Sequence, residues 1–235
     1  MRHGNPSPWW IALTVLGLIV PRSALPAPTA VYSMDFAGFS GGTILNWLTS
    51  KGFTPKQDAA NANKVVFFDQ GNDLVLETKT KAFGLLLNES DVSGFSKIRI
   101  QWGVDVFPQG ASYEKGVRSE AVMVYVFFGK TKLSSGSLLI PDSPYFIGLF
   151  LCESDKTGEA FTGRYFKAGG RFICVSRPPV GELITTEYPL ADSFKRIFGK
   201  TEVPDISGFG LSIDTNNAKG NGIARAFIRK IEFVK

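Results

Sequence analysis

Few of the side chains that usually carry out enzymatic chemistry occur in this chain. It has one histidine, His3, and two cysteines, Cys152 and Cys174. Serine and cysteine hydrolases need an imidazole to carry the proton, and zinc sites use imidazoles or several thiolates. Because His3 lies in a segment that we expect to be removed, the mature protein should lack imidazole. The sequence therefore argues against these hydrolases and against a zinc site.

Carboxylates are the remaining candidates for catalysis. A glycosidase without histidine needs two carboxylates that flank the scissile bond. The candidate pairs are Glu153 with Asp155, and Glu120 with Glu77 across strands. Acidic residues are plentiful, so solvated surface carboxylates are the favoured interpretation. The glycine-rich residues 38–42 lack the Gly-Lys-Ser/Thr ending of a phosphate-binding loop.

The segment 214–221 contains several oxygen-bearing side chains. Asp214 and Asn216, together with Asn217 and Asn221, offer oxygens to a hard cation such as calcium, and Asp35 from a neighbouring strand would complete the set. The spacing does not fit an EF-hand. Asn and Gly are also the residues that a tight turn between strands requires. We therefore favour a turn and keep a structural calcium ion as the alternative; no other cofactor is expected.

Aromatic side chains are the candidates for a binding surface, because sugars stack their apolar ring faces on flat side chains. Tyr125 and Phe127 lie on the second face of an apolar strand, and Arg99 and Gln101 are candidate hydroxyl partners. Trp102 shares its strand face with aliphatic residues, which indicates core packing.

The elements that must position these residues are predicted to be strands. In residues 97–106, Ile98, Ile100, Trp102, Val104 and Val106 alternate with polar residues, which is typical of a half-buried strand. Residues 121–128 are apolar on both faces, as expected of a central strand. Further strands are predicted at residues 65–68, 74–78, 83–87, 145–151, 209–213 and 226–234, with Gly-rich turns between them. This pattern predicts an all-β protein with a single antiparallel β-sandwich.

Two short helices are also predicted. Thr43 is a suitable N-cap for a turn that carries Ile44 and Trp47. Leu190 begins a second amphipathic segment, and Gly199 is a suitable stop signal for it. We expect both helices to cover the ends of the sandwich.

The first thirty residues are predicted to be a secretory signal peptide. An apolar run at residues 9–20 follows a weakly positive start and precedes a small-residue stretch at residues 24–30. The run is shorter than the roughly 20 residues of a membrane-spanning helix. We therefore expect a secreted or periplasmic protein without stable membrane insertion, with one domain over residues 31–235. Loss of Arg2 and Arg22 lowers the formal net charge from +5 to +3, so a nucleic-acid partner is not expected.

Export changes the interpretation of the two cysteines. Cys152 and Cys174 each end or interrupt an apolar stretch, with a polar loop between them. A disulfide would form if the two stretches are neighbouring strands, and it would contribute about 3 kcal/mol. Two separately buried free cysteines are the alternative.

The last fifty residues resemble a known family. The resemblance rests on Phe198-Gly199, on Pro-Asp-Ile-Ser-Gly-Phe-Gly at residues 204–210, on Ile-Asp-Thr-Asn-Asn at residues 213–217 and on Ile231-Glu232-Phe233. It extends to Asp35-Phe36 and to the Phe-Gly that ends the central strand. The chain is similar to secreted bacterial proteins of the domain of unknown function family 3047. It departs from them at Asn216, where an acidic residue is usual, and at Ala218, where Thr is usual.

The resemblance implies a jelly-roll-like sandwich similar to carbohydrate-binding modules, and no known activity. The sequence therefore favours non-catalytic binding of a glycan or another cell-envelope ligand. A carboxylate-based glycan-cleaving enzyme and a structural envelope protein that packs against a partner chain are the alternatives.

Overall fold

The computed structural model describes Met1 and residues 29–235, so the predicted signal peptide lies almost entirely outside the described residues. Its first strand, β1, spans Ala30–Asp35. The backbone N–H of Lys235 donates to the carbonyl of Thr29, next to this strand. The domain boundary predicted at residue 31 therefore falls inside β1.

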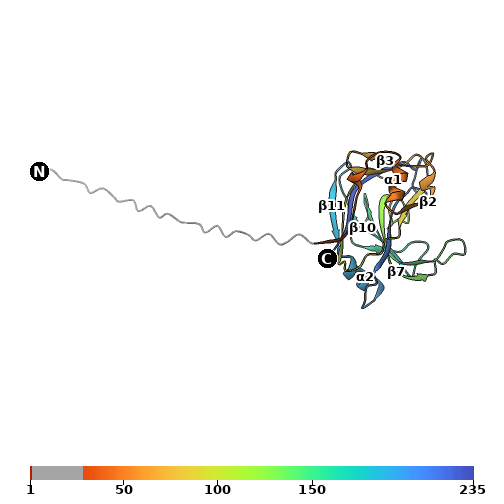
Figure 1. The fold of residues 1–235 in the computed structure, drawn as a ribbon, viewed down its shortest axis with the longest axis vertical. Helices are drawn as coiled ribbons and strands as arrows, with labels where there is room; N and C mark the ends of the chain where they lie inside the picture. The colour runs from red at the N-terminus through yellow and green to blue at the C-terminus, as the bar shows by residue number, and fades with distance from the viewer. Residues whose placement is uncertain (2–28) are drawn as a thin grey trace.

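The chain folds into two β-sheets (Figure 1). The first has six strands, and all of its pairings are antiparallel. Its order is β11 (Ile184–Tyr188), β6 (Lys97–Val106), β13 (Ala224–Val234), β4 (Asp73–Thr78) and β3 (Val65–Gln70), and β1 pairs with the C-terminal half of β13.

The second sheet has seven strands and carries the candidate site. Its order is β2 (Phe53–Gln57), β5 (Phe83–Asn88), β12 (Ile206–Asp214), β7 (Glu120–Leu133), β8 (Ser143–Leu151), β10 (Gly170–Ser176) and β9 (Ala160–Phe161). The pair β8 and β10 is parallel, and the other pairings are antiparallel. The predicted all-β sandwich is confirmed, with this one parallel pair as an exception to its antiparallel order.

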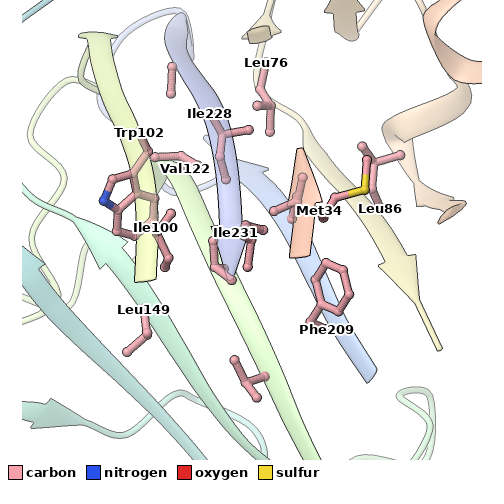
Figure 2. Close-up of a cluster of buried hydrophobic side chains, with 14 of the residues drawn as sticks. Met34, Leu76, Leu86, Ile100, Trp102, Val122, Leu149, Phe209, Ile228 and Ile231 are labelled. Carbon is pink, nitrogen blue, oxygen red and sulfur yellow. The ribbon is translucent and has the colours of Figure 1, made fainter. Parts of the chain in front are cut away.

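The core lies between the two sheets. Leu76, Ile100 and Trp102 from the six-stranded sheet meet Val122 and Phe209 from the seven-stranded sheet (Figure 2). The indole Nε1 of Trp102 donates to the hydroxyl of Thr186 at 3.0 Å, so the buried ring leaves no unpaired donor. The predicted core position of Trp102 is confirmed.

Two helices cover the ends of the sandwich, as the sequence predicts. Helix α1 (Ile44–Ser50) and helix α2 (Leu190–Phe198) lie at opposite ends of the domain in Figure 1. The hydroxyl of Thr43 accepts from the N–H of Asn46, and Gly199 ends α2 at a φ of 63°. Two short 3-10 turns, Phe36–Gly38 and Asp58–Ala60, complete the fold. Within residues 29–235, no helix is long and apolar enough to cross a bilayer.

Candidate binding surface

The outer face of the seven-stranded sheet carries an aromatic surface. In β7, Val124 and Val126 point into the core, so Tyr125 and Phe127 point away from it. Both of these rings are half-buried. We call this side of the sheet the aromatic face.

The two rings are held in a fixed arrangement. The centroids of Tyr125 and Phe127 are 6.0 Å apart, with only 12° between the ring planes. The buried ring of Phe146 contacts both, at 5.6 Å from Tyr125 and 5.8 Å from Phe127. Phe172 of β10 lies 6.3 Å from Tyr125. Because other aromatic rings support them, the exposed parts of Tyr125 and Phe127 form an ordered apolar platform.

The β12 residues that lie beside this platform are glycines and have no side chains. Gly208 pairs with Phe127, and Gly210 pairs with Tyr125. A Cβ atom on Gly210 would lie 3.3 Å from the Cδ1 atom of Leu85, which belongs to β5 on the other side of β12. No β12 side chain therefore separates the β5 leucines from the two rings, and the apolar surface spans three strands.

An acidic pair lies on the same face. Glu120 of β7 pairs across the sheet with Asp214 of β12. Alternation along β7 would place Glu120 in the core with Val122, but the register between the strands shifts between Ser212 and Asp214. This β-bulge turns Glu120 to the outer face, as bulges do beside many functional sites.

Hydrogen bonds fix the Glu120 carboxyl group. The hydroxyl of Ser212 donates to Oε1 at 3.1 Å, and the hydroxyl of Tyr113 donates to Oε2 at 2.8 Å. The Tyr113 ring packs on Phe150, with centroids 4.5 Å apart, and covers Glu120, which is 3% exposed.

Burial, and next the nearby charge of Asp214, raise the pKa of Glu120 to about 8. Burial also raises the pKa of Asp214 to about 6, although the hydrogen bond that it accepts from the N–H of Asn216 lowers this pKa. No ion pair within residues 29–235 reaches either carboxyl group. At neutral pH the pair therefore holds a proton. Burial, and then the charges of Glu120 and Asp214, raise the pKa of Tyr125 as well, which links the platform to the pair.

A disulfide joins the strands of this face. Cys152 and Cys174 are bonded, with their Cα atoms 5.7 Å apart, and they pack with Met123 and Phe150. The pairing predicted from the sequence is confirmed, and the alternative of two free cysteines is wrong.

The structure does not bring all of the predicted binding residues together. Tyr125 and Phe127 lie on the aromatic face, whereas Arg99 and Gln101 belong to β6 in the other sheet. Arg99 there donates to Glu187 at 2.6 Å. The prediction of one joint site is wrong because alternation within a strand does not show which sheet the strand enters.

Asp35 is separated from the other residues of the predicted calcium site. Asp35 lies opposite Lys230 in the six-stranded sheet and accepts from the N–H of Ala37 at 2.9 Å. Asp214 belongs to the other sheet, and its bond from the N–H of Asn216 is that of an Asx turn. No group of three or more His, Cys, Asp or Glu side chains in the described part of the chain is arranged to hold a metal ion. This geometry favours the turn interpretation of residues 214–221.

Neither predicted carboxylate pair forms. Glu77 lies in β4 beside Arg225, in the sheet opposite Glu120. Asp155 is buried and accepts from the N–H of Tyr113 at 2.8 Å, whereas Glu153 is exposed. Glu120, which the sequence offers only as a candidate partner of Glu77, lies beside Asp214 instead. Only the pairing of β12 with β7, which short-range patterns do not encode, identifies Asp214 as its partner.

Comparisons with known proteins give distant structural likenesses only. No family model matches the chain, and no curated protein matches it. The carbohydrate recognition domain of Emp46p in its potassium-bound form has a TM-score of 0.44 and 12% identity, over 88% of this chain and 97% of that one. A lectin from Bauhinia forficata in complex with GalNAc has a TM-score of 0.38 and 9% identity, over 86% and 97%. Endoglucanase 3 from Trichoderma harzianum has a TM-score of 0.35 and 8% identity, over 78% and 98%. At these values the ligands and substrates of those proteins imply nothing about this chain.

Proposed function

We propose that this protein binds a glycan or another cell-envelope ligand on its aromatic face, without catalysis. The observation that carries the proposal is the platform of Tyr125 and Phe127, whose rings are half-buried and nearly parallel. The platform continues to the leucines of β5, because the β12 residues between them are glycines. Sugar rings present flat apolar faces that pack on such a surface.

We place this function outside the cytoplasm. The disulfide between Cys152 and Cys174 supports an oxidising compartment, because such bonds persist in secreted and periplasmic proteins. A secreted or periplasmic location also gives the aromatic face access to envelope polysaccharides.

Binding is tested by affinity electrophoresis in gels that contain soluble polysaccharides, and by a glycan array. Tyr125→Ala and Phe127→Ala should each weaken binding about tenfold, since aromatic packing contributes about 1.5 kcal/mol beyond burial. Phe68→Ala is the matched control, because Phe68 is a half-buried ring on β3 in the opposite sheet. Equal retardation of the wild type and both variants would contradict the proposal.

Glycan cleavage by the acidic pair is a second candidate. The observation that favours it is a protonated Glu120 beside Asp214, next to the platform, which provides an acid and a base at neutral pH. The burial of Glu120 beneath Tyr113 favours binding over cleavage. The test measures the release of reducing ends from a polysaccharide that the protein binds. Release by the wild type, and its loss in a Glu120→Gln variant that still binds the polysaccharide, would establish cleavage.

A further inference from the structure

The connection between β7 and β8 presents two leucines to solvent. β7 extends as far as Leu133, which pairs with Ser143 at the start of β8. In Figure 1 the green loop that follows β7 extends away from the two sheets. Within this loop, residues 134–142, Leu138 is 105% exposed and Leu139 is 93% exposed. Single exposed apolar residues are common on protein surfaces, but two adjacent leucines at a projecting tip indicate an interaction site.

The base of this loop is an ordered structure. Ser135 is buried, and its hydroxyl donates to the carbonyl of Ile140 at 2.6 Å. The N–H of Ser135 donates to Asp142 at 3.0 Å, which closes the loop. The N–H of Phe166 donates to the carbonyl of Ser135 at 2.9 Å and joins the loop to a second segment. These bonds hold the leucines away from the body of the domain.

Basic residues are frequent in the flanks of the loop and in the segment that is hydrogen-bonded to it. The loop with its flanks, residues 129–145, and the segment around Phe166, residues 162–171, together carry five basic residues and one acidic residue, Asp142. The basic residues are Lys130, Lys132, Arg164, Lys167 and Arg171. Lys130 also lies 3.3 Å from the exposed carboxylate of Asp91. A loop with an apolar tip and a positively charged base is complementary to a surface that carries negative charge on the outside and hydrocarbon beneath it.

We propose that this loop docks the protein on the surface of an anionic phospholipid bilayer. Leu138 and Leu139 enter the boundary between head groups and acyl chains, and the basic residues lie against the anionic head groups. The charge distribution favours a bilayer over an apolar pocket on another protein, because such a pocket would not require basic residues in both segments. Two leucines with a few basic residues give reversible adhesion.

Sedimentation with phosphatidylcholine vesicles, with and without phosphatidylglycerol, tests this docking. The wild type should bind only the vesicles that contain phosphatidylglycerol, and less at high salt. Leu138→Ser with Leu139→Ser should reduce the partition coefficient at least about tenfold, because it removes the apolar area that enters the bilayer. Lys130→Gln with Lys132→Gln should reduce it about fivefold for each charge.

Val180→Ser is the matched control, because Val180 is 63% exposed and lies outside both segments; it should leave vesicle binding unchanged. The leucine variant should keep the circular dichroism spectrum and the polysaccharide binding of the wild type, so docking and ligand binding fail independently. Absence of wild-type binding to phosphatidylglycerol vesicles, or equal binding by the leucine variant, would overturn the proposal.

Discussion

The acidic residues on the outer faces of the two sheets have different neighbours. On the six-stranded sheet, carboxylates lie beside cations: Arg99 contacts Glu187 at 2.6 Å, and Arg229 contacts Asp73 at 2.8 Å. On the seven-stranded sheet, Glu120 faces another carboxyl group. The bond from Arg99 lowers the pKa of Glu187, whereas burial raises the pKa of Glu120.

This difference separates a sheet whose surface charges are compensated by ion pairs from a sheet that presents apolar rings. On the six-stranded sheet, the ion pairs compensate the charges of these carboxylates. The aromatic face has two half-buried rings, Tyr125 and Phe127, and burial raises the pKa of both neighbouring acids, Glu120 and Asp214. Half-buried apolar rings are a feature that a bound ligand complements, so the comparison supports the proposal that a ligand binds on the seven-stranded sheet.

The largest expected effect comes from removal of the crosslink on the aromatic face. Cys152→Ala with Cys174→Ala should lower the free energy of unfolding by about 3 kcal/mol, because the unfolded chain regains the freedom of a loop with a sequence separation of 22. Chemical denaturation measures it. The loss should be the same at low and high salt, since no ion pair is removed. A loss below about 1 kcal/mol would indicate that packing alone holds β8 and β10 together.

The acidic pair should make stability fall as pH rises. The pKa of Glu120 is raised in the folded state, so its contribution is complete below the unfolded pKa and is lost as pH rises through about 8. The Glu120→Gln variant should have nearly the same free energy of unfolding as the wild type at about pH 5. At about pH 9 it should be more stable than the wild type by on the order of 2 kcal/mol. Urea denaturation at both pH values measures the difference. Parallel pH profiles for the two proteins would show that Glu120 ionises freely.

Asp214→Asn is the matched variant for that experiment. An asparagine side chain can still accept the hydrogen bond that Asp214 receives from the N–H of Asn216. The pKa of Asp214 is raised to about 6, so the stability profile of this variant should depart from the wild type between about pH 4 and pH 6. It should also lower the midpoint of the Glu120 titration, because one negative charge is removed.

Local patterns predict most of the central strands and both helices, and they offer the crosslink as one of two alternatives. Alternation predicts β6, a run that is apolar on both faces predicts β7, and Thr43 and Gly199 mark helix ends. The two cysteines lie at or in apolar stretches, which allows the disulfide that the structure contains. Each of these signals depends on residues that are close in sequence. Edge strands gave weaker signals: β2 and β11 have mostly polar or exposed positions, since each has only one neighbour in its sheet.

The candidate site depends on long-range register, which no local pattern contains. Glu120 and Asp214 are far apart in the chain and meet only because β12 pairs with β7. The bulge that turns Glu120 outward reverses the face that alternation assigns to it. For the same reason, strand periodicity alone does not separate Arg99 from Tyr125, although β6 and β7 lie in different sheets.

The smallest expected effect tests the six-stranded face. Glu187→Gln removes the partner of Arg99, but the Glu187 side chain is 42% exposed, so the loss should be about 0.5 kcal/mol or less. The folded pKa of Glu187 is lowered, so this contribution is present above its unfolded pKa and is lost as pH falls through the folded pKa. Its pH dependence is therefore opposite in sign to that of Glu120, and salt should weaken it. Denaturation in acid and at neutral pH, with and without salt, measures both. A loss as large as that of the disulfide variant would mean that the ion pairs, and not the buried packing, stabilise this sheet, and the contrast between the two faces would not hold.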